Sequence, residues 1–335
     1  MSATRPTRSA PRLIAVVAVI APLIASLALW AFAWPAARTA PRDLPLGVAG
    51  PAAATAQVEA GLTRQEGAFE IHRYADEAAA RDAIEDREVY GAVVVTEQGP
   101  KLLTATAASP LVAQMLQQAV SRQAAATGKP VPTVDVVATP AEDPRGTGLN
   151  AAALPLTLAG IAAGALVTLL GLRGLRAVAA LAGATALVGI AMTALAHSWL
   201  GFLTGDWWTE AGALSLTALA VAGAVAGLAA LLGPAGIGVG AALVMLIGNP
   251  FSGAASAPEM LPAPAGTIGQ WMPPGAGASL LRSVSYFDGA AATGPALTLA
   301  WWTVLGLGAV LLGPALKSRT AGSTRTAERE PALTG

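Results

Sequence analysis

Cysteine is absent from this chain of 335 residues, and histidine occurs only twice, as His72 and His197. The absence of cysteine excludes disulfide bonds, thiolate catalysis, Cys-ligated zinc and iron–sulfur clusters. Any exported domain must therefore be held together by packing alone. The two histidines are too few and too far apart in the sequence to suggest a metal site, and no cofactor is expected.

Charged residues are also scarce, because they make up 12% of the chain against about a quarter in ordinary soluble domains. Of the 20 basic and 20 acidic residues, 10 and 14 lie between Arg38 and Arg145. One polar segment is thus flanked by long stretches that are almost free of charge. A net charge of zero and a pI near 6.8 give no sign of a nucleic-acid partner.

The first uncharged stretch, residues 13–34, is strongly apolar. About 20 residues are enough for a helix to cross the bilayer, so a transmembrane helix is predicted here. Basic residues up to Arg12 precede it, and Trp30 and Trp34 lie at its far end, which indicates a cytoplasmic N-terminus. A cleaved signal peptide is the alternative, because Ala31–Ala33 resembles a signal-peptidase site. The apolar run exceeds the roughly 7–15 residues usual for such a peptide, which favours a retained helix.

A second apolar block fills residues 151–316, and five further spans are predicted within it. Their ranges are 151–172, 177–198, 211–232, 236–249 and 296–316. The chain is therefore expected to be a polytopic α-helical membrane protein with about six transmembrane helices. The protein is expected to be embedded in a lipid bilayer. A long outer loop at 250–295 separates the last two spans.

The basic residues outside the polar segment agree with one orientation in the membrane. Nine Lys or Arg lie in the N-terminal tail 1–12, the turn at 173–176 and the C-terminal tail 317–335. The loop 250–295 holds only one. The positive-inside rule therefore predicts a multi-pass protein of the plasma membrane with both termini in the cytoplasm. The tail 317–335 is expected to be disordered.

Residues 35–150, between the first and second spans, read as alternating strands and helices in the order βαβαββαβ. The helix that follows Ser109 has the clearest signals, because Ser109 suits the N-cap, Pro110 suits the first turn, and Gly128 suits the C-terminal stop. This order predicts an α/β domain with a largely parallel sheet, inserted between spans one and two and extracellular.

The sequence lacks the common motifs of catalytic and nucleotide-binding sites. It contains no GxSxG, HExxH, SxxK or P-loop pattern, so we expect no enzyme, and any ATP must be hydrolysed by a separate subunit. Ion-coupled transporters usually keep ionisable side chains inside their spans, and the predicted spans carry none, with His197 lying at a boundary. A proton-driven antiporter is therefore disfavoured.

The loop 250–295, with Asn249 before it, is too long for a turn and too apolar for a disordered linker. Its prolines and glycines exclude one continuous span, and Ala276–Tyr286 is predicted to form a short helix lying on or dipping into the membrane. The loop is expected either to gate a pathway and contact a substrate, or to pack as an ordered outer cap. The residues singled out for the first role are Asn249, Pro250, Phe251, Trp271, Pro273, Pro274, Arg282, Tyr286 and Phe287.

Three stretches carry a resemblance to a known family. They are Leu44–Val48, Asp86–Val95 (DREVYGAVVV) and, most specifically, Asn249–Gly289 with NPFSG, PEMLP and PPGAGASLLRSVSYFDG. Together with the order of spans, they resemble type-2 ABC exporter permeases, in the branch of the phage infection protein (YhgE/Pip-like) family found in actinobacteria. The resemblance implies an exporter subunit that forms a homodimer and works with a cytoplasmic ABC ATPase.

A different function class stays open beside the permease. Such permeases usually present a cytoplasmic coupling helix between spans two and three, whereas the connection here is only about Leu172–Arg176. Short cytoplasmic loops favour a non-transporting scaffold, envelope-assembly factor or surface receptor that acts through its extracellular domain. A membrane-embedded enzyme is a third and weaker hypothesis.

Overall fold

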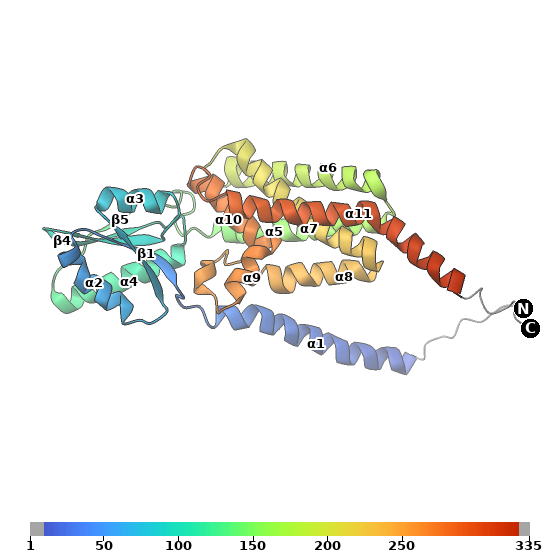
Figure 1. The fold of residues 1–335 in the computed structure, drawn as a ribbon, viewed down its shortest axis with the longest axis horizontal. Coiled ribbons are helices and arrows are strands. Elements are labelled where there is room, and N and C mark those ends of the chain that lie inside the picture. The colour runs from blue at the N-terminus through green and yellow to red at the C-terminus, as the bar shows by residue number, and fades with distance from the viewer. Residues whose placement is uncertain (1–9, 328–335) are drawn as a thin grey trace, which may run out of the picture.

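The computed structural model describes residues 10–327, which form two parts lying end to end (Figure 1). An α/β domain stands at one end, and a bundle of apolar helices extends from it. Helix α1 (Ala10–Ala36) begins, and helix α11 (Thr293–Ala327) ends, at the pole of the bundle remote from the α/β domain (Figure 1). Residues 1–9 of the expected N-terminal tail lie outside the described residues.

The α/β domain is built on a five-stranded sheet in the order β2-β1-β3-β4-β5. All neighbouring strands are parallel except β3 and β4, which form an antiparallel hairpin. The predicted order βαβαββαβ and the largely parallel sheet are therefore confirmed. The elements are β1 (Leu44–Ala49), α2 (Ala52–Thr63), β2 (Phe69–Tyr74), α3 (Glu77–Glu85), β3 (Gly91–Thr96), β4 (Gly99–Thr104), α4 (Pro110–Thr127) and β5 (Thr133–Asp135).

Local signals account for the helix ends in this domain. The side chains of Asp76 and Ser109 accept hydrogen bonds from backbone N–H groups in the first turns of α3 and α4. Gly128 closes α4 in the left-handed conformation that glycine adopts without strain. Beyond the end of β4, the Asp135 carboxylate at the end of β5 accepts hydrogen bonds from the N–H and the hydroxyl of Thr106.

Each face of the sheet carries its own hydrophobic core. Helix α3 covers one face, where Ile84 packs with Val94 and Leu103. Helices α2 and α4 cover the other face, where Val112 packs with Leu46. Two covered faces explain why the strands read as nearly continuous apolar runs rather than as alternating ones.

Five helices of the described residues are long and apolar enough to cross a membrane, so the chain is a polytopic helical membrane protein. The spans are Ile14–Ala36 in α1, α5 (Gly148–Leu169), Gly174–Trp199 formed by α6 (Gly174–Thr193) with the π-helical turn η1 (Ala194–Trp199), α7 (Trp207–Leu232) and Thr293–Gly313 in α11.

The sixth predicted span, 236–249, is not a full span. Helix α8 (Ala235–Ala242) continues into the π-helical turn η2 (Leu243–Gly248), and together they hold 14 residues. At 1.5 Å per residue they reach about 21 Å, well short of the roughly 30 Å of hydrocarbon. The expected number of about six spans is therefore corrected to five, with one partly crossing segment.

Helix α7 is the centre of the bundle and the most buried of the five spans, with α5, α6, α8 and α11 packed around it. Glycines allow the close approach. A side chain at Gly164 of α5 would meet the Ala222 carbonyl of α7, and one at Gly306 of α11 would collide with the backbone of Gly223. Small residues at these contacts bring helix backbones together in place of a hydrophobic driving force, which lipid does not supply.

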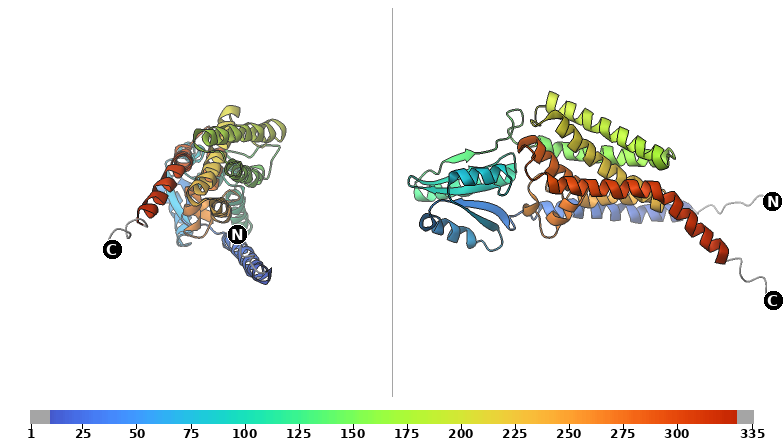
Figure 2. Two further views of the ribbon diagram at one scale, coloured as in Figure 1. Left: turned by 90° about the vertical axis from the view of Figure 1, so that its right-hand side faces the viewer. Right: turned by 45° about the horizontal axis from the view of Figure 1, so that its top comes forward.

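Helix α1 stands apart from the other spans in Figure 1 and in the left view of Figure 2. Its apolar side chains are mostly exposed, and it meets the rest of the chain near its outer end, where the Trp34 ring lies 6.0 Å from that of Phe251. An apolar helix with this exposure is suited to contact with lipid or with another membrane chain.

Helix α11 runs beyond its apolar part to Ala327, into the tail 317–335 for which disorder is expected. Once a helix is formed, each further residue adds a hydrogen bond at little cost, so the helix extends past the membrane segment. Residues 328–335 lie outside the described part of the chain.

Candidate functional site

The segment between η2 and α11, residues 249–292, is an ordered cap on the outer end of the bundle. It contains η3 (Pro258–Met260), α9 (Ala265–Trp271) and α10 (Pro273–Tyr286). Helix α10 begins earlier than the expected Ala276, at Pro273. Almost all of its residues are buried, and it packs against α7, where Gly277 is in close contact with Thr217.

The cap also enters both cores of the α/β domain. Ala257 and Met260 belong to the core between the sheet and α4, while Phe287 belongs to the core beneath α3. The guanidinium of Arg87 lies 5.3 Å from the centre of the Phe287 ring, a cation–π contact. One segment thus inserts into the helix bundle on one side and into the α/β domain on the other.

Polar contacts reinforce this junction. Arg87 donates from Nη1 to the Ser279 carbonyl at 3.0 Å and to the hydroxyl of Ser283, both on α10. The Tyr90 hydroxyl donates to the Glu259 carboxylate at 2.8 Å. Arg42, in the linker between α1 and β1, donates to the Met260 carbonyl at 3.0 Å. The α/β domain is therefore fastened to the cap rather than tethered by a flexible linker.

A cavity of about 240 Å³ lies in the same junction. Its lining combines charged, polar and apolar residues: Pro45, Arg87, Glu88, Val89, Tyr90, Ala108, Pro258, Glu259, Gln270, Ser279, Arg282, Ala291 and Pro295. Burial, together with the nearby charge of Arg282, lowers the pKa of Arg87 to about 10. Burial also raises the pKa of Tyr90, with the Glu259 carboxylate adding to the effect, so this phenol stays neutral and donates its proton.

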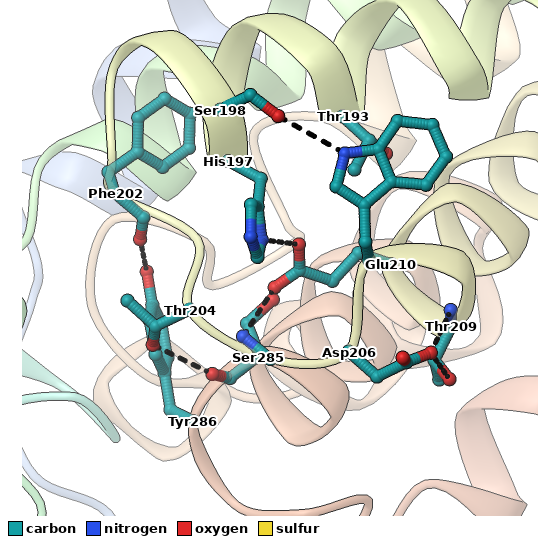
Figure 3. Close-up of polar contacts among 12 residues, drawn as sticks. Thr193, His197, Ser198, Phe202, Thr204, Asp206, Thr209, Glu210, Ser285 and Tyr286 are labelled. Atoms are coloured by element: carbon teal, nitrogen blue, oxygen red, sulfur yellow. Dashed lines mark hydrogen bonds and ion pairs between the residues drawn. The ribbon is translucent and has the colours of Figure 1, made fainter.

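A second polar cluster lies where α6 and α7 meet the cap (Figure 3). The π-helical turn η1 carries His197, whose Nδ1 lies 2.9 Å from Oε2 of Glu210 in the first turn of α7. The other oxygen of Glu210 accepts the Gly205 N–H at 2.8 Å. The Glu210 side chain is fully buried, so both of its oxygens depend on these partners.

The loop between η1 and α7 is tied to the end of α10 beside this pair (Figure 3). The Tyr286 hydroxyl donates to the Phe202 carbonyl at 2.6 Å, and Thr204 donates to the Ser285 carbonyl at 3.1 Å. Asp206 caps α7 by accepting the Thr209 N–H, and its hydrogen bonds with Thr209 lower the pKa of its carboxyl. The cap is thus held by the outer ends of two spans.

The residues predicted to gate or to contact a substrate do not form one site. Pro273 and Pro274 are buried at the start of α10, and Asn249 and Pro250 lie in the turn after η2. Trp271 is 68% exposed on the outside of the cap, where its carbonyl accepts the indole N–H of Trp302. These residues build or border the cap without lining the cavity.

The remaining predicted residues divide among several places. Arg282 lines the cavity, Tyr286 joins the polar cluster of Figure 3, and Phe287 fills the core of the α/β domain. Phe251 packs against Trp34 of α1 instead. Tyr286 is partly buried and Phe287 is buried, because the cap folds between the two parts of the chain.

Sequence reasoning missed Arg87, Tyr90 and Glu259 in the cavity and the pair of His197 with Glu210. Arg87 adopts a left-handed backbone conformation with φ of 63° just after α3, which no local pattern signals. Glu210 carried one usable signal, since it is followed directly by a long uncharged run.

Among residues 10–327, no three His, Asp or Glu side chains gather into a metal site, and the two clusters offer charge and hydrogen bonds rather than a nucleophile. No family model, curated protein or solved structure matches this chain. The function is therefore argued from the junction itself.

Proposed function

We propose that the chain is the membrane permease subunit of an ABC-type exporter of the phage infection protein (YhgE/Pip-like) branch. The observation that carries this proposal is the double insertion of the cap. Helix α10 packs against the central helix α7, while Phe287 and Met260 fill the two cores of the α/β domain. A rearrangement of the bundle would thereby be transmitted through the cap to the α/β domain.

The proposed location of the protein is the plasma membrane, with the α/β domain extracellular and both termini cytoplasmic. The turn between α5 and α6 lies at the pole of the bundle remote from the α/β domain (Figure 1). Arg173 belongs to this turn, which supports a cytoplasmic side by the positive-inside rule. The first turn of α7, with Trp207 and Trp208, lies at the opposite pole, where an aromatic belt at the outer interface is expected.

A permease of this kind would need two partners. The sequence has no P-loop, so a separate cytoplasmic ABC ATPase would supply the energy. A second copy of the chain would complete the pathway, since the described helices of one copy pack tightly around α7, which is itself the most buried span. The exposed apolar surface of α1 is compatible with that copy as well as with lipid.

One observation favours the alternative of a non-transporting scaffold, envelope-assembly factor or surface receptor. The turns at the inner pole are short: only four residues separate α5 from α6, and two separate α7 from α8. These short turns offer an ATPase little docking surface apart from the inner ends of α1 and α11. The alternative predicts a partner bound to the extracellular domain and no bound ATPase.

The deciding experiment is mild-detergent purification of the full-length chain, followed by mass spectrometry of the proteins that accompany it. A stoichiometric ATPase with a P-loop, whose hydrolysis changes on reconstitution with this chain, supports the permease. Recovery of envelope or surface proteins without an ATPase overturns it in favour of the scaffold. A variant with the α/β domain disrupted, Phe287→Ala, should keep the ATPase in the first case and lose the partner in the second.

A further inference from the structure

We propose that the junction cavity is a binding site for a phosphate-type oxyanion, held between Arg87 of the α/β domain and Arg282 of the cap. The anion would be either free phosphate or the phosphodiester of an anionic lipid headgroup, since both present the same group. The site would link the two parts of the protein through its ligand. This inference does not depend on whether the chain transports anything.

The first observation is that neither guanidinium has a carboxylate partner. Among residues 10–327 the salt bridges are those of His72, Arg73, Arg81, Lys101 and His197, and none involves Arg87 or Arg282. Arg282 is only 6% exposed, yet its side chain makes one hydrogen bond, from Nη2 to the Ala254 carbonyl. The Glu259 carboxylate attracts both guanidinium groups but lies beyond ion-pair distance of either. A buried charge that is only partly neutralised is costly, so a ligand that completes its neutralisation would bind with a gain.

The second observation is that both guanidinium groups keep donors free at the cavity. Each has five N–H donors in a planar fork. Arg282 uses one of them, and Arg87 uses only Nη1, for the Ser279 carbonyl and the Ser283 hydroxyl. Both residues line the cavity, and the two charges are close enough for Arg282 to weaken the protonation of Arg87. Two like charges that face one space favour an anion between them.

A polar residue of the cap stiffens one wall of the cavity without taking a donor from either guanidinium. Gln270 donates to the Ser252 carbonyl at 2.8 Å and accepts from the Ser279 hydroxyl at 2.7 Å. These bonds fix the wall beside Arg87, whose Nη1 donates to the Ser279 carbonyl. Pre-organised donors lose little freedom when the ligand binds, which favours affinity.

Two acids also line the cavity and must be considered. The Glu88 carboxylate accepts from the Tyr74 hydroxyl at 3.2 Å on the exposed surface of the domain, so water screens its charge. The Glu259 carboxylate accepts from Tyr90 and forms no ion pair with either guanidinium of the cavity. Glu259 therefore opposes the anion, and its removal should strengthen binding.

A phosphate fits better than a carboxylate. One guanidinium fork already satisfies the two oxygens of a carboxylate, whereas two forks that face each other need the three or four oxygens of a phosphate group. The cavity of about 240 Å³ is large enough for such a group with a short substituent. Its position between the α/β domain and the outer end of the bundle is also where a lipid headgroup would lie.

The test uses the full-length chain in a non-ionic detergent and follows its thermal unfolding with increasing sodium phosphate, with sodium acetate at equal ionic strength as the reference. Phosphate should raise the midpoint temperature of unfolding, and acetate should not. Arg87→Gln or Arg282→Gln should increase the half-saturating phosphate concentration about tenfold to a hundredfold, because each removes charge-assisted hydrogen bonds. Arg64→Gln, which changes an exposed arginine of the same domain, is the matched control and should leave it unchanged.

The Glu259→Gln variant should shift the half-saturating phosphate concentration in the opposite direction. It keeps both arginines, so it tests the site even where an arginine variant folds poorly. It should lower the half-saturating concentration several-fold, because the amide oxygen still accepts from Tyr90 without the negative charge. Weaker binding in this variant would overturn the proposal, since removal of a negative charge from the wall of an anion site must favour the anion. An equal response to phosphate and acetate in all variants would overturn it as well.

A second experiment, in nanodiscs, distinguishes a lipid headgroup from free phosphate as the ligand. Native mass spectrometry would count the lipids that stay bound from discs of phosphatidylglycerol or of phosphatidylcholine. Retention of phosphatidylglycerol that Arg282→Gln abolishes identifies a lipid headgroup, and a response to free phosphate alone identifies a soluble ligand. The absence of both responses in the unaltered chain would refute the site.

Discussion

Nδ1 of His197 lies 2.9 Å from the carboxylate of Glu210, and this pair joins two membrane helices at their outer ends (Figure 3). Glu210 also accepts the Gly205 N–H and has no exposed surface. Its two oxygens thus hold both η1 and the following loop against α7. A buried carboxylate with two fixed partners is a structural clamp whose removal leaves other polar groups unpaired.

Replacement of Glu210 by Ala should destabilise the bundle by about 2–4 kcal/mol, since both His197 and the Gly205 N–H lose their acceptor. Glu210→Gln keeps one acceptor oxygen and should cost less, about 1 kcal/mol. The measurement is the unfolding midpoint of the full-length chain in detergent. Glu66→Gln, at an exposed acid of the α/β domain, serves as control. Equal midpoints for the three variants would contradict the clamp.

Close packing of α11 on α7 predicts opposite effects at two glycines of one helix. Gly306 faces the backbone of Gly223, so Gly306→Ala should cost about 1–3 kcal/mol by overpacking. A methyl group added at Gly308 would meet no neighbour within 4 Å, so Gly308→Ala should be neutral or stabilise the helix by up to about 1 kcal/mol. Thermal unfolding in detergent measures both, and the same sign at both positions would be inconsistent with this packing.

Phe287 is expected to couple the cap to the α/β domain. It is 5% exposed in that domain's core, and Phe287→Ala should cost about 3–5 kcal/mol there. The local effect should appear as faster hydrogen exchange in the strands, with the exchange of α7 unchanged. Phe32→Ala, at an exposed position of α1, should alter neither region. Uniform destabilisation of the whole chain would argue against a separable contact.

The proposed orientation is accessible to cysteine labelling, because the chain has no native cysteine. Cysteines at Ala75 in the α/β domain and at Thr293 at the outer end of α11 should react with an impermeant maleimide on intact cells. A cysteine at Leu170, in the turn between α5 and α6, should react only after lysis. All three positions are exposed, so absence of labelling reports the side of the membrane. Labelling of Leu170 from outside would reverse the orientation.

Acid should weaken the α/β domain through Glu77. Hydrogen bonds from Lys101 and Arg81 hold the pKa of the Glu77 carboxyl below its usual value of 4.5. Because the folded pKa is the lower one, this stabilisation is complete above the unfolded pKa and is lost as the pH falls through the folded pKa. Glu77→Gln should therefore cost at most about 1 kcal/mol at neutral pH and nothing near pH 2. Hydrogen exchange in β4 measures the difference, with Asp82→Asn on the same helix as control.

Much of the fold could be predicted because it depends on local patterns. The strand and helix order of the α/β domain follows from apolar runs, from the caps at Asp76 and Ser109, and from Gly128. The long apolar helices follow from the length of uncharged stretches. The short α8 and the burial of α10 could not be predicted, because a membrane segment and a buried soluble helix have the same composition.

The sequence by itself determined that this is a polytopic membrane protein with one polar α/β segment, since both conclusions rest on the distribution of charge and apolar length along the chain. Only the tertiary structure decided which polar residues meet. Arg87 and Arg282 are separated by almost two hundred residues, and His197 reaches Glu210 only because η1 and α7 pack together. Such pairs are set by packing between distant elements, which no local pattern records.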